Sequence, residues 1–80
     1  MDKELQEYYE TLLDLFTHKG WSQFIEDIEG NAEMLRDITT IKDEQGFWYR
    51  RGQLEAVQRI LSYESAIKDS YEDFERENNE

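Results

Sequence analysis

Two pairs of neighbouring carboxylates and a single histidine are the residues whose chemistry could serve a reaction. The pairs are Glu26–Asp27 and Glu72–Asp73, and the histidine is His18. Catalytic carboxylates need burial or crowding that shifts their pKa values. Both pairs fall on the polar sides of expected helices, and no serine, cysteine or second histidine is arranged with His18. We therefore expect solvated carboxylates and a histidine at the end of a helix.

Motifs that hold metals, nucleotides or cofactors do not occur in the sequence. The chain has no cysteine and one histidine, which excludes thiolate sites and histidine-rich metal sites. The spaced acidic pattern of a calcium loop and the glycine patterns of phosphate-binding loops are also absent. We expect no catalytic, cofactor-binding or metal-binding residues, and therefore a protein that is not an enzyme.

The segment GFWYRRGQ, residues 46–53, places three aromatics and two arginines together in a chain whose net charge is −11. Successive residues of a helix are about 100° apart, so the three aromatics cannot share one face. Phe47 aligns with Leu54 on a later turn. We expect Phe47 to lie in the core.

A row of small side chains follows Trp48 along the same expected helix. Trp48, Gly52 and Ala56 recur at intervals of four residues, and the glycine has no Cβ. We expect a groove here that another helix or a ring can approach closely, with Trp21 as its occupant. A tight crossing would offset the roughly 1 kcal/mol of helix propensity that a glycine costs.

The charge of this segment differs from that of its surroundings. Residues 47–63 hold three arginines against one acid, whereas residues 21–46 hold seven acids against two bases. Arg50 and Arg51 could pair with an acidic helix of the same chain, in exposed contacts worth about 0–1 kcal/mol each. Alternatively, they form with Trp48 a contact surface for a neighbouring subunit or an acidic partner, since Trp, Tyr and Arg are enriched at interface hot spots. Stacking on nucleic acid is disfavoured by the surrounding negative charge.

Composition limits the remaining possibilities. The chain has 80 residues, enough for one small domain, and no proline, which suits uninterrupted helices. Twenty acids against nine bases argue against direct binding to nucleic acid. No apolar run approaches the roughly 20 residues that span a bilayer, and the N-terminus lacks the order of a secretion signal. We expect a soluble protein made inside a cell, without membrane contact.

The first expected helix covers residues 3–18, where apolar residues recur at helical spacing. Asp2 is placed to cap its start, and His18 suits the negative end of the helix dipole. Gly20 is expected to end the helix in the left-handed conformation.

The second expected helix covers residues 22–38. Ser22 is a candidate N-cap, although Trp21 could also lie inside the first turn. The Gly30–Asn31 pair in the middle weakens the helix, so a kink or a break there remains open.

The third expected helix covers residues 43–76, with Asp43 as its cap. Such a helix would be roughly 50 Å long and could extend beyond the two shorter helices. An uncovered apolar stripe ending in Tyr71 and Phe74 would favour association. Glu64 interrupts the stripe, and it either points outwards at the stripe's edge or fixes the register of the helices.

The expected fold is all-α, with two short helices packed on one long C-terminal helix, as a three-helix bundle or an extended helical hairpin. Residues 1–76 form a single helical domain in this interpretation. Residues 77–80 form a disordered, solvated tail.

The segments FTHKGWSQFIEDI and FWYRRGQLEAVQRILSYESAI resemble a group of small helical proteins encoded among the virion morphogenesis genes of tailed bacteriophages. The resemblance rests on Gly20–Trp21 and on residues 49–53, and it extends over residues 12–70. It implies a helical virion-associated or assembly protein and carries over no catalytic residues.

The function expected from these features is that of a small acidic structural or interaction protein of a phage, acting through helix-mediated association. The expected partner is a virion protein or a second copy, contacted by five residues: Trp48, Arg50, Arg51, Tyr71 and Phe74. Such a protein would be found in the host cytoplasm during expression and then in the virion. The alternative is an acidic inhibitor that imitates the charge of DNA and blocks a host nucleic-acid enzyme, although Arg50, Arg51 and Arg59 interrupt its acidic face.

Overall fold

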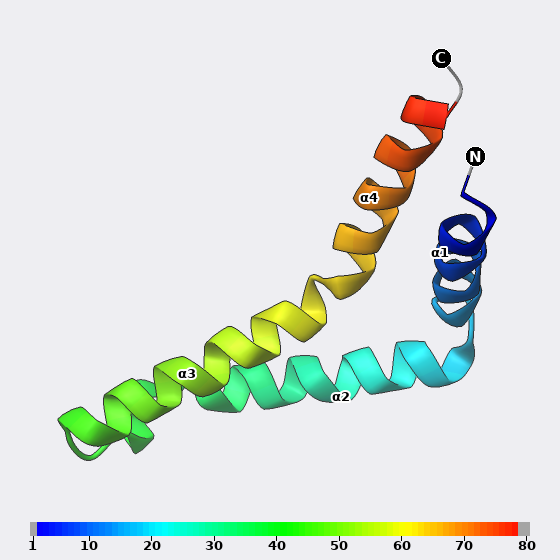
Figure 1. Cartoon of the computed structure of the whole chain (residues 1–80). Coiled ribbons are helices and arrows are strands. Elements are labelled where there is room, and N and C mark those ends of the chain that lie inside the picture. The colour runs from blue at the N-terminus through cyan, green and yellow to red at the C-terminus, as the bar shows by residue number, and fades with distance from the viewer. Residues whose placement is uncertain (1, 79–80) are drawn as a thin grey trace. The chain divides into compact units, whose positions relative to one another are not determined.

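The structure, a computed structural model, describes residues 2–78, which form helices joined by short turns and connections (Figure 1). The elements are α1 (Lys3–Leu15), α2 (Lys19–Leu35), the 3-10 helix η1 (Ile38–Thr40), α3 (Glu44–Leu61) and α4 (Tyr63–Asn78). No strand occurs in this part of the chain. The all-α fold class is confirmed.

Contacts within the chain divide it into two compact units. Unit 1 combines Met1–Ser22 with Ser62–Glu80, and unit 2 is Gln23–Leu61. The first turn of α2 therefore belongs to unit 1, together with α1 and α4. The rest of α2 belongs to unit 2, together with η1 and α3.

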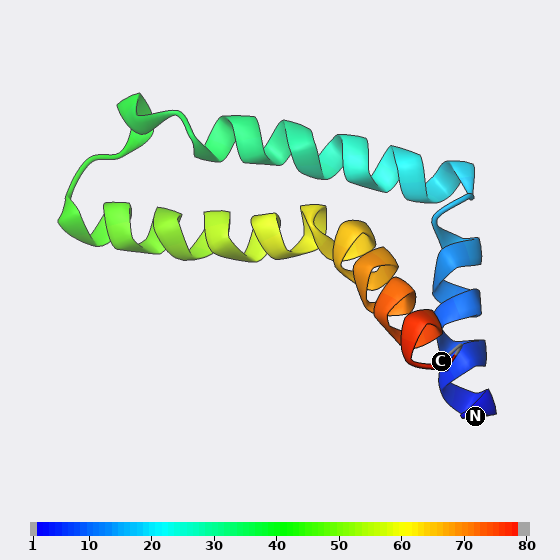
Figure 2. The ribbon, with the colours of Figure 1, turned by 90° about the horizontal axis from the view of Figure 1, so that it is seen from above.

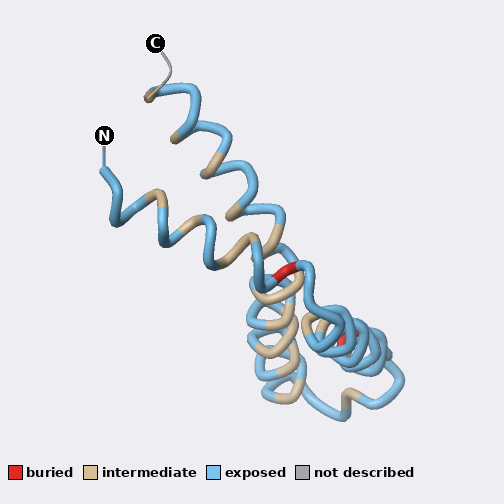
Figure 3. The backbone as a smooth tube through the Cα atoms, turned by 90° about the vertical axis from the view of Figure 1, so that its right-hand side faces the viewer, coloured by how far each residue is buried: buried red, intermediate tan, exposed pale blue. Residues whose placement is uncertain are grey.

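In unit 1, α1 and α4 lie side by side and run in opposite directions (Figures 1 and 3). Aromatic rings fill the space between them. The ring of Tyr9 on α1 lies 5.6 Å from each of the rings of Tyr71 and Phe74 on α4. Near the other end of α4, the buried ring of Phe16 lies 5.9 Å from the ring of Tyr63. Edge and tilted ring pairs at such distances add stability beyond the area that they bury.

In unit 2, the segment of α2 from Gln23 onward and α3 run antiparallel (Figure 2). Ala32 on α2 is fully buried, and with Phe16 it makes up the buried apolar set of the described residues (Figure 3). Asp43 caps α3, because its Oδ1 accepts a hydrogen bond from the backbone N–H of Gly46 at 2.7 Å. The expectation for Asp43 is confirmed.

The first helix begins as expected and ends earlier. Asp2 caps α1 by accepting a hydrogen bond from the N–H of Leu5, at 3.1 Å. The helix ends at Leu15 rather than at residue 18. Gly20 was expected to end it with a positive φ, but no glycine in the described chain has one, and Gly20 lies inside α2.

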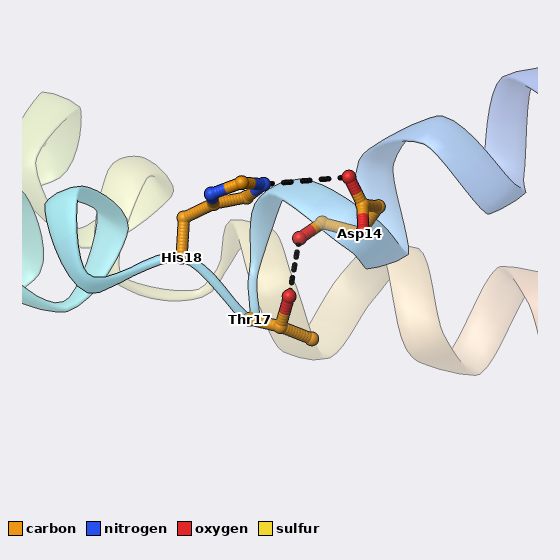
Figure 4. Close-up of polar contacts among 3 residues, drawn as sticks. All are labelled: Asp14, Thr17 and His18. Carbon is orange, nitrogen blue, oxygen red and sulfur yellow. Dashed lines mark hydrogen bonds and ion pairs between the residues drawn. The ribbon is translucent and has the colours of Figure 1, made fainter.

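Side-chain bonds within the turn between α1 and α2 explain this earlier end (Figure 4). The Oγ1 of Thr17 donates to the carbonyl of Asp14 at 2.7 Å, and His18 Nε2 lies 3.3 Å from Asp14 Oδ2. Short-range hydroxyl bonds of this kind compete with the helical ladder. The backbone carbonyl of His18 accepts the N–H groups of Trp21 and Ser22, so the next helix starts at once.

The second helix is displaced toward the N-terminus relative to the expected range of residues 22–38. It begins at Lys19 and ends at Leu35, so Trp21 lies in the first turn and Ser22 is not the N-cap. The helix continues through Gly30, so it is not broken at the Gly30–Asn31 pair. Asp37 instead caps η1, since its side chain accepts from the N–H of Thr39.

The long helix expected over residues 43–76 is divided into two helices of ordinary length. A turn at Ser62 separates α3 from α4, and the carbonyl of Ser62 accepts the N–H of Ala66 at 2.9 Å as α4 begins. Serine is a weak helix former because its hydroxyl competes for backbone groups. The expected arrangement of two short helices on one long helix is therefore replaced by four helices.

The C-terminal end of the last helix also differs from the expectation. α4 continues to Asn78, so residues 77 and 78 of the expected disordered tail are helical. Asn78 Nδ2 donates to the carbonyl of Phe74 at 2.7 Å in this last turn. The rest of the expected tail, residues 79–80, lies outside the described residues.

Candidate protein-interaction surface

Three consecutive aromatic residues at the start of α3 form an exposed surface, here called the α3 aromatic patch: Phe47, Trp48 and Tyr49. Their exposed fractions are 46%, 55% and 72%. The cap at Asp43 starts the helix, so the patch lies in its first two turns. Phe47 was expected in the core, and this expectation is wrong, because Phe47 is 46% exposed and lines an open hollow.

Arg50 binds within the molecule. Its Nη1 donates to the carbonyl of Leu35 at 3.1 Å and to the carbonyl of Asp37 at 3.3 Å. These carbonyls lie at the C-terminal end of α2, where the last turns of a helix leave acceptors unsatisfied. A cation there also interacts favourably with the helix dipole. The intramolecular interpretation of the arginine pair therefore applies to Arg50, through backbone carbonyls rather than carboxylates.

The carboxylate of Asp37 is occupied locally and is not bound by Arg50. Both the hydroxyl and the N–H of Thr39 donate to its Oδ1. The hydroxyl hydrogen bond is the largest cause that holds the pKa of Asp37 below its usual value, followed by the backbone bond. The connection between α2 and α3 is thus fixed by its own polar groups. Arg50 of α3 adds its hydrogen bonds to the carbonyls of Leu35 and Asp37.

Arg51 holds the tryptophan of the patch in place from the same helix. Its guanidinium carbon lies 5.5 Å from the centre of the Trp48 ring, a cation–π distance. Its Nε also lies 3.5 Å from Oε1 of Glu55, and both side chains of that pair are largely exposed. Exposed pairs contribute little stability, so Arg51 remains available to other anions.

An open hollow adjoins the patch in unit 2, here called the α3 hollow, with a volume of about 280 Å³. It is lined by Leu35, Arg36, Ile38, Ile41, Phe47, Arg50, Arg51 and Leu54. The segment after α2 supplies Ile38 and Ile41. Ile38 was expected in the apolar stripe of the helix over residues 22–38, but it lies in η1, and Ile41 was expected only as part of a connection.

The groove expected beside Gly52 is empty. A Cβ placed on Gly52 would meet nothing within 4 Å. Trp21 packs instead against the rings of Phe16 and Tyr63, at 5.0 and 6.4 Å. The expectation that Trp21 fills the groove is therefore wrong.

The C-terminal pair of the predicted contact residues is partly covered. Tyr71 and Phe74 pack on Tyr9 and are half-buried, so this end of the apolar stripe is not the uncovered surface that would favour association. A hydrogen bond with Glu75 is the largest cause that raises the pKa of Tyr71. Their role as partner contacts stays a prediction.

The residues considered for reaction chemistry are solvated. Both acid pairs, Glu26–Asp27 and Glu72–Asp73, are exposed, and His18 pairs only with the exposed carboxylate of Asp14. Among residues 2–78, no group of three His, Cys, Asp or Glu side chains is placed to hold a metal ion. None of the helices in this range combines the length and the apolar character needed to cross a membrane.

The candidate surface therefore consists of the α3 aromatic patch, the α3 hollow and the arginines between them. All of its residues belong to unit 2. Comparisons with protein-family models, with curated proteins and with solved structures found no match.

Proposed function

We propose that this chain is a small structural or interaction protein that associates with other proteins through the α3 aromatic patch. The observation that carries this proposal is the exposure of three consecutive aromatic side chains on one well-capped helix. Burial of a large apolar side chain is worth about 1.5–3 kcal/mol, and the isolated chain forgoes much of this gain at the patch. The rings of Phe47 and Trp48 lie 5.3 Å apart, and exposed apolar surface of this kind is typical of interaction sites.

Among the five predicted contact residues, Trp48 and Arg51 are the best supported. Trp48 is more than half exposed and is held by the guanidinium of Arg51. Arg50 acts as the anchor of the surface, because its hydrogen bonds fix the end of α2 beside the patch. Tyr71 and Phe74 would contribute only the edges that Tyr9 leaves uncovered.

The proposed setting is the virion of a tailed bacteriophage or its assembly pathway, with the host cytoplasm as the place of synthesis. This part rests on the resemblance carried by Gly20–Trp21 and residues 49–53. The partner is a virion protein or a second copy of the chain. Mass spectrometry of purified virions would test the setting: the chain should be present in a fixed ratio to the major capsid protein.

Light scattering at several concentrations, alone and with virion proteins, tests association itself. The expected result is a mass above that of the monomer, reduced in a Trp48→Ala/Tyr49→Ala double variant. Met34→Ser is the matched control, because Met34 has the same exposed fraction as Tyr49, 72%, but lies outside the α3 aromatic patch. A monomer under all conditions, with no affinity for any virion protein, would overturn the proposal.

One observation favours the alternative of DNA-charge mimicry. Unit 1 has twelve acids against four bases, a net charge of −8, whereas unit 2 has eight acids against five bases, a net charge of −3. A mimic would present the acidic faces of α1 and α4 to a host enzyme. A pull-down from host lysate would test this alternative. Recovery of a polymerase or a nuclease, in an amount that falls as the salt concentration rises, would support it over association through α3.

A further inference from the structure

We infer that the α3 hollow receives a bulky apolar side chain from an acidic segment of a partner protein. This inference rests on the proposed association function and adds the chemistry of the partner. It is carried by two features of one site in unit 2: a lining of five apolar residues and three arginines in the same lining.

Five of the eight residues that line the hollow are apolar, and the hollow is open to a partner. Leu35, Ile38, Ile41, Phe47 and Leu54 supply aliphatic and aromatic surface from α2, η1, the connection and α3. Ile38 is 74% exposed and Phe47 is 46% exposed, so both present apolar surface to water. The volume of about 280 Å³ lies at or below the roughly 300–1,000 Å³ of small-molecule sites, which suits an inserted side chain.

The lining of the hollow carries positive charge in an acidic chain. Arg36, Arg50 and Arg51 line the hollow, and no carboxylate does. Arg36 makes no ion pair or side-chain hydrogen bond within residues 2–78. Arg50 uses Nη1 on two carbonyls, and Arg51 shares a loose 3.5 Å contact with Glu55. The remaining N–H groups of these guanidinium groups can donate bidentate hydrogen bonds to carboxylates.

The charge distribution favours a partner segment over a second copy of the chain. A second copy would bring another net charge of −11, which repels the first. A partner needs only a few carboxylates beside its apolar anchor, because exposed charges farther away than about 8 Å are screened at physiological salt. The adjoining α3 aromatic patch extends the contact beyond one side chain, which suits a protein segment.

The test uses the full chain and a fluorescein-labelled helical peptide with one central phenylalanine flanked by glutamates. Fluorescence anisotropy measures binding, and amide chemical shifts locate it. We expect binding that shifts the amides of residues 35–41 and 47–54. Peptides with alanine at the centre, or with glutamine for glutamate, should bind at least about tenfold more weakly.

Exposed residues of the hollow provide variants that leave the fold intact. Ile38→Asp should weaken binding of the acidic peptide by at least about tenfold, and Arg36→Gln by about threefold. Met34→Asp and Lys42→Gln are the matched controls, since both positions are exposed and neither lines the hollow. The controls should bind as the unchanged chain does.

Two results would overturn the inference. One is binding that Ile38→Asp and Arg36→Gln leave unchanged. The other is that sodium dodecanoate changes the amide chemical shifts of the hollow while none of the peptides binds. This result would assign the hollow to an anionic amphiphile. If association still depended on Trp48 in either case, the proposed function would stand and only the inference would fail.

Discussion

The indole N–H of Trp21 donates a hydrogen bond to the carboxylate of Glu64 at 2.8 Å, joining residues that are 43 positions apart in the chain. The second carboxylate oxygen accepts from Lys68 Nζ at 2.6 Å. Glu64 therefore connects the first turn of α2 to the first turn of α4 within unit 1. The two roles left open for Glu64 were an outward position at the stripe's edge and fixing the register of the helices; its hydrogen bond to Trp21 is a contact between helices, as the second role requires.

Removal of this carboxylate should destabilise the protein. We expect Glu64→Ala to lower the free energy of unfolding by about 1 kcal/mol, because a partly exposed charge-assisted pair of hydrogen bonds is lost. Urea unfolding followed by circular dichroism measures the change. Asp69→Ala is the control, since Asp69 is an exposed acid of the same helix, and it should change stability little. Equal effects of the two variants would contradict the proposed role of Glu64.

The same contact predicts a dependence of stability on pH. The Lys68 hydrogen bond, and then the Trp21 hydrogen bond, hold the pKa of Glu64 below its usual 4.5. A carboxyl whose pKa is lower in the folded state stabilises the fold above the unfolded value, and the contribution disappears as pH falls through the folded value. Thermal unfolding from neutral to acidic pH should therefore show a steeper loss below about 4.5 for the unchanged chain than for Glu64→Gln. Parallel curves would contradict this assignment.

The hydrogen bonds of Arg50 predict a second stability effect, confined to unit 2. Arg50→Ala should lower the free energy of unfolding by about 1–2 kcal/mol, because the carbonyl of Leu35 loses its donor, whereas the carbonyl of Asp37 keeps the hydroxyl of Thr40. Hydrogen exchange of the last turn of α2 should accelerate in this variant. Arg51→Ala is the matched control and should cost less than about 1 kcal/mol, since its ion pair is exposed. The reverse order of the two effects would show that Arg50 does not cap α2.

Features that depend on neighbouring residues could be predicted from the sequence. Helical spacing and the absence of proline gave the fold class, and Asp2 and Asp43 cap helices where expected. Helix ends set by particular side-chain bonds could not be predicted in this way. Thr17 ends α1 by a hydroxyl bond to Asp14, and this bond competes with an equally reasonable end at Gly20.

Contacts between distant segments were the least accessible to sequence reasoning. The apolar spacing continues across Ser62, so periodicity alone predicts one helix, while the structure turns there. Phe47 aligns with Leu54, yet its burial depends on what covers the hollow, and nothing in unit 2 does. Pairing within the molecule was one of two alternatives for Arg50, and its observed acceptors are backbone carbonyls, which no charge count reveals.

Gly52 provides a prediction that separates the structure from the expected groove. A filled groove would make Gly52→Ala destabilising, whereas open space around the Cβ position makes the change favourable. We expect Gly52→Ala to raise the free energy of unfolding by about 1 kcal/mol, because alanine favours the helix and restricts the unfolded chain. Gly46→Ala is the contrasting variant, because its Cβ would lie 3.0 Å from Asp43 Oδ1, the atom that caps α3. The increase in the free energy of unfolding should therefore be smaller for Gly46→Ala, or become a decrease. Denaturant unfolding of both variants measures the difference, and a destabilised Gly52→Ala would show that a ring or helix occupies this face in solution.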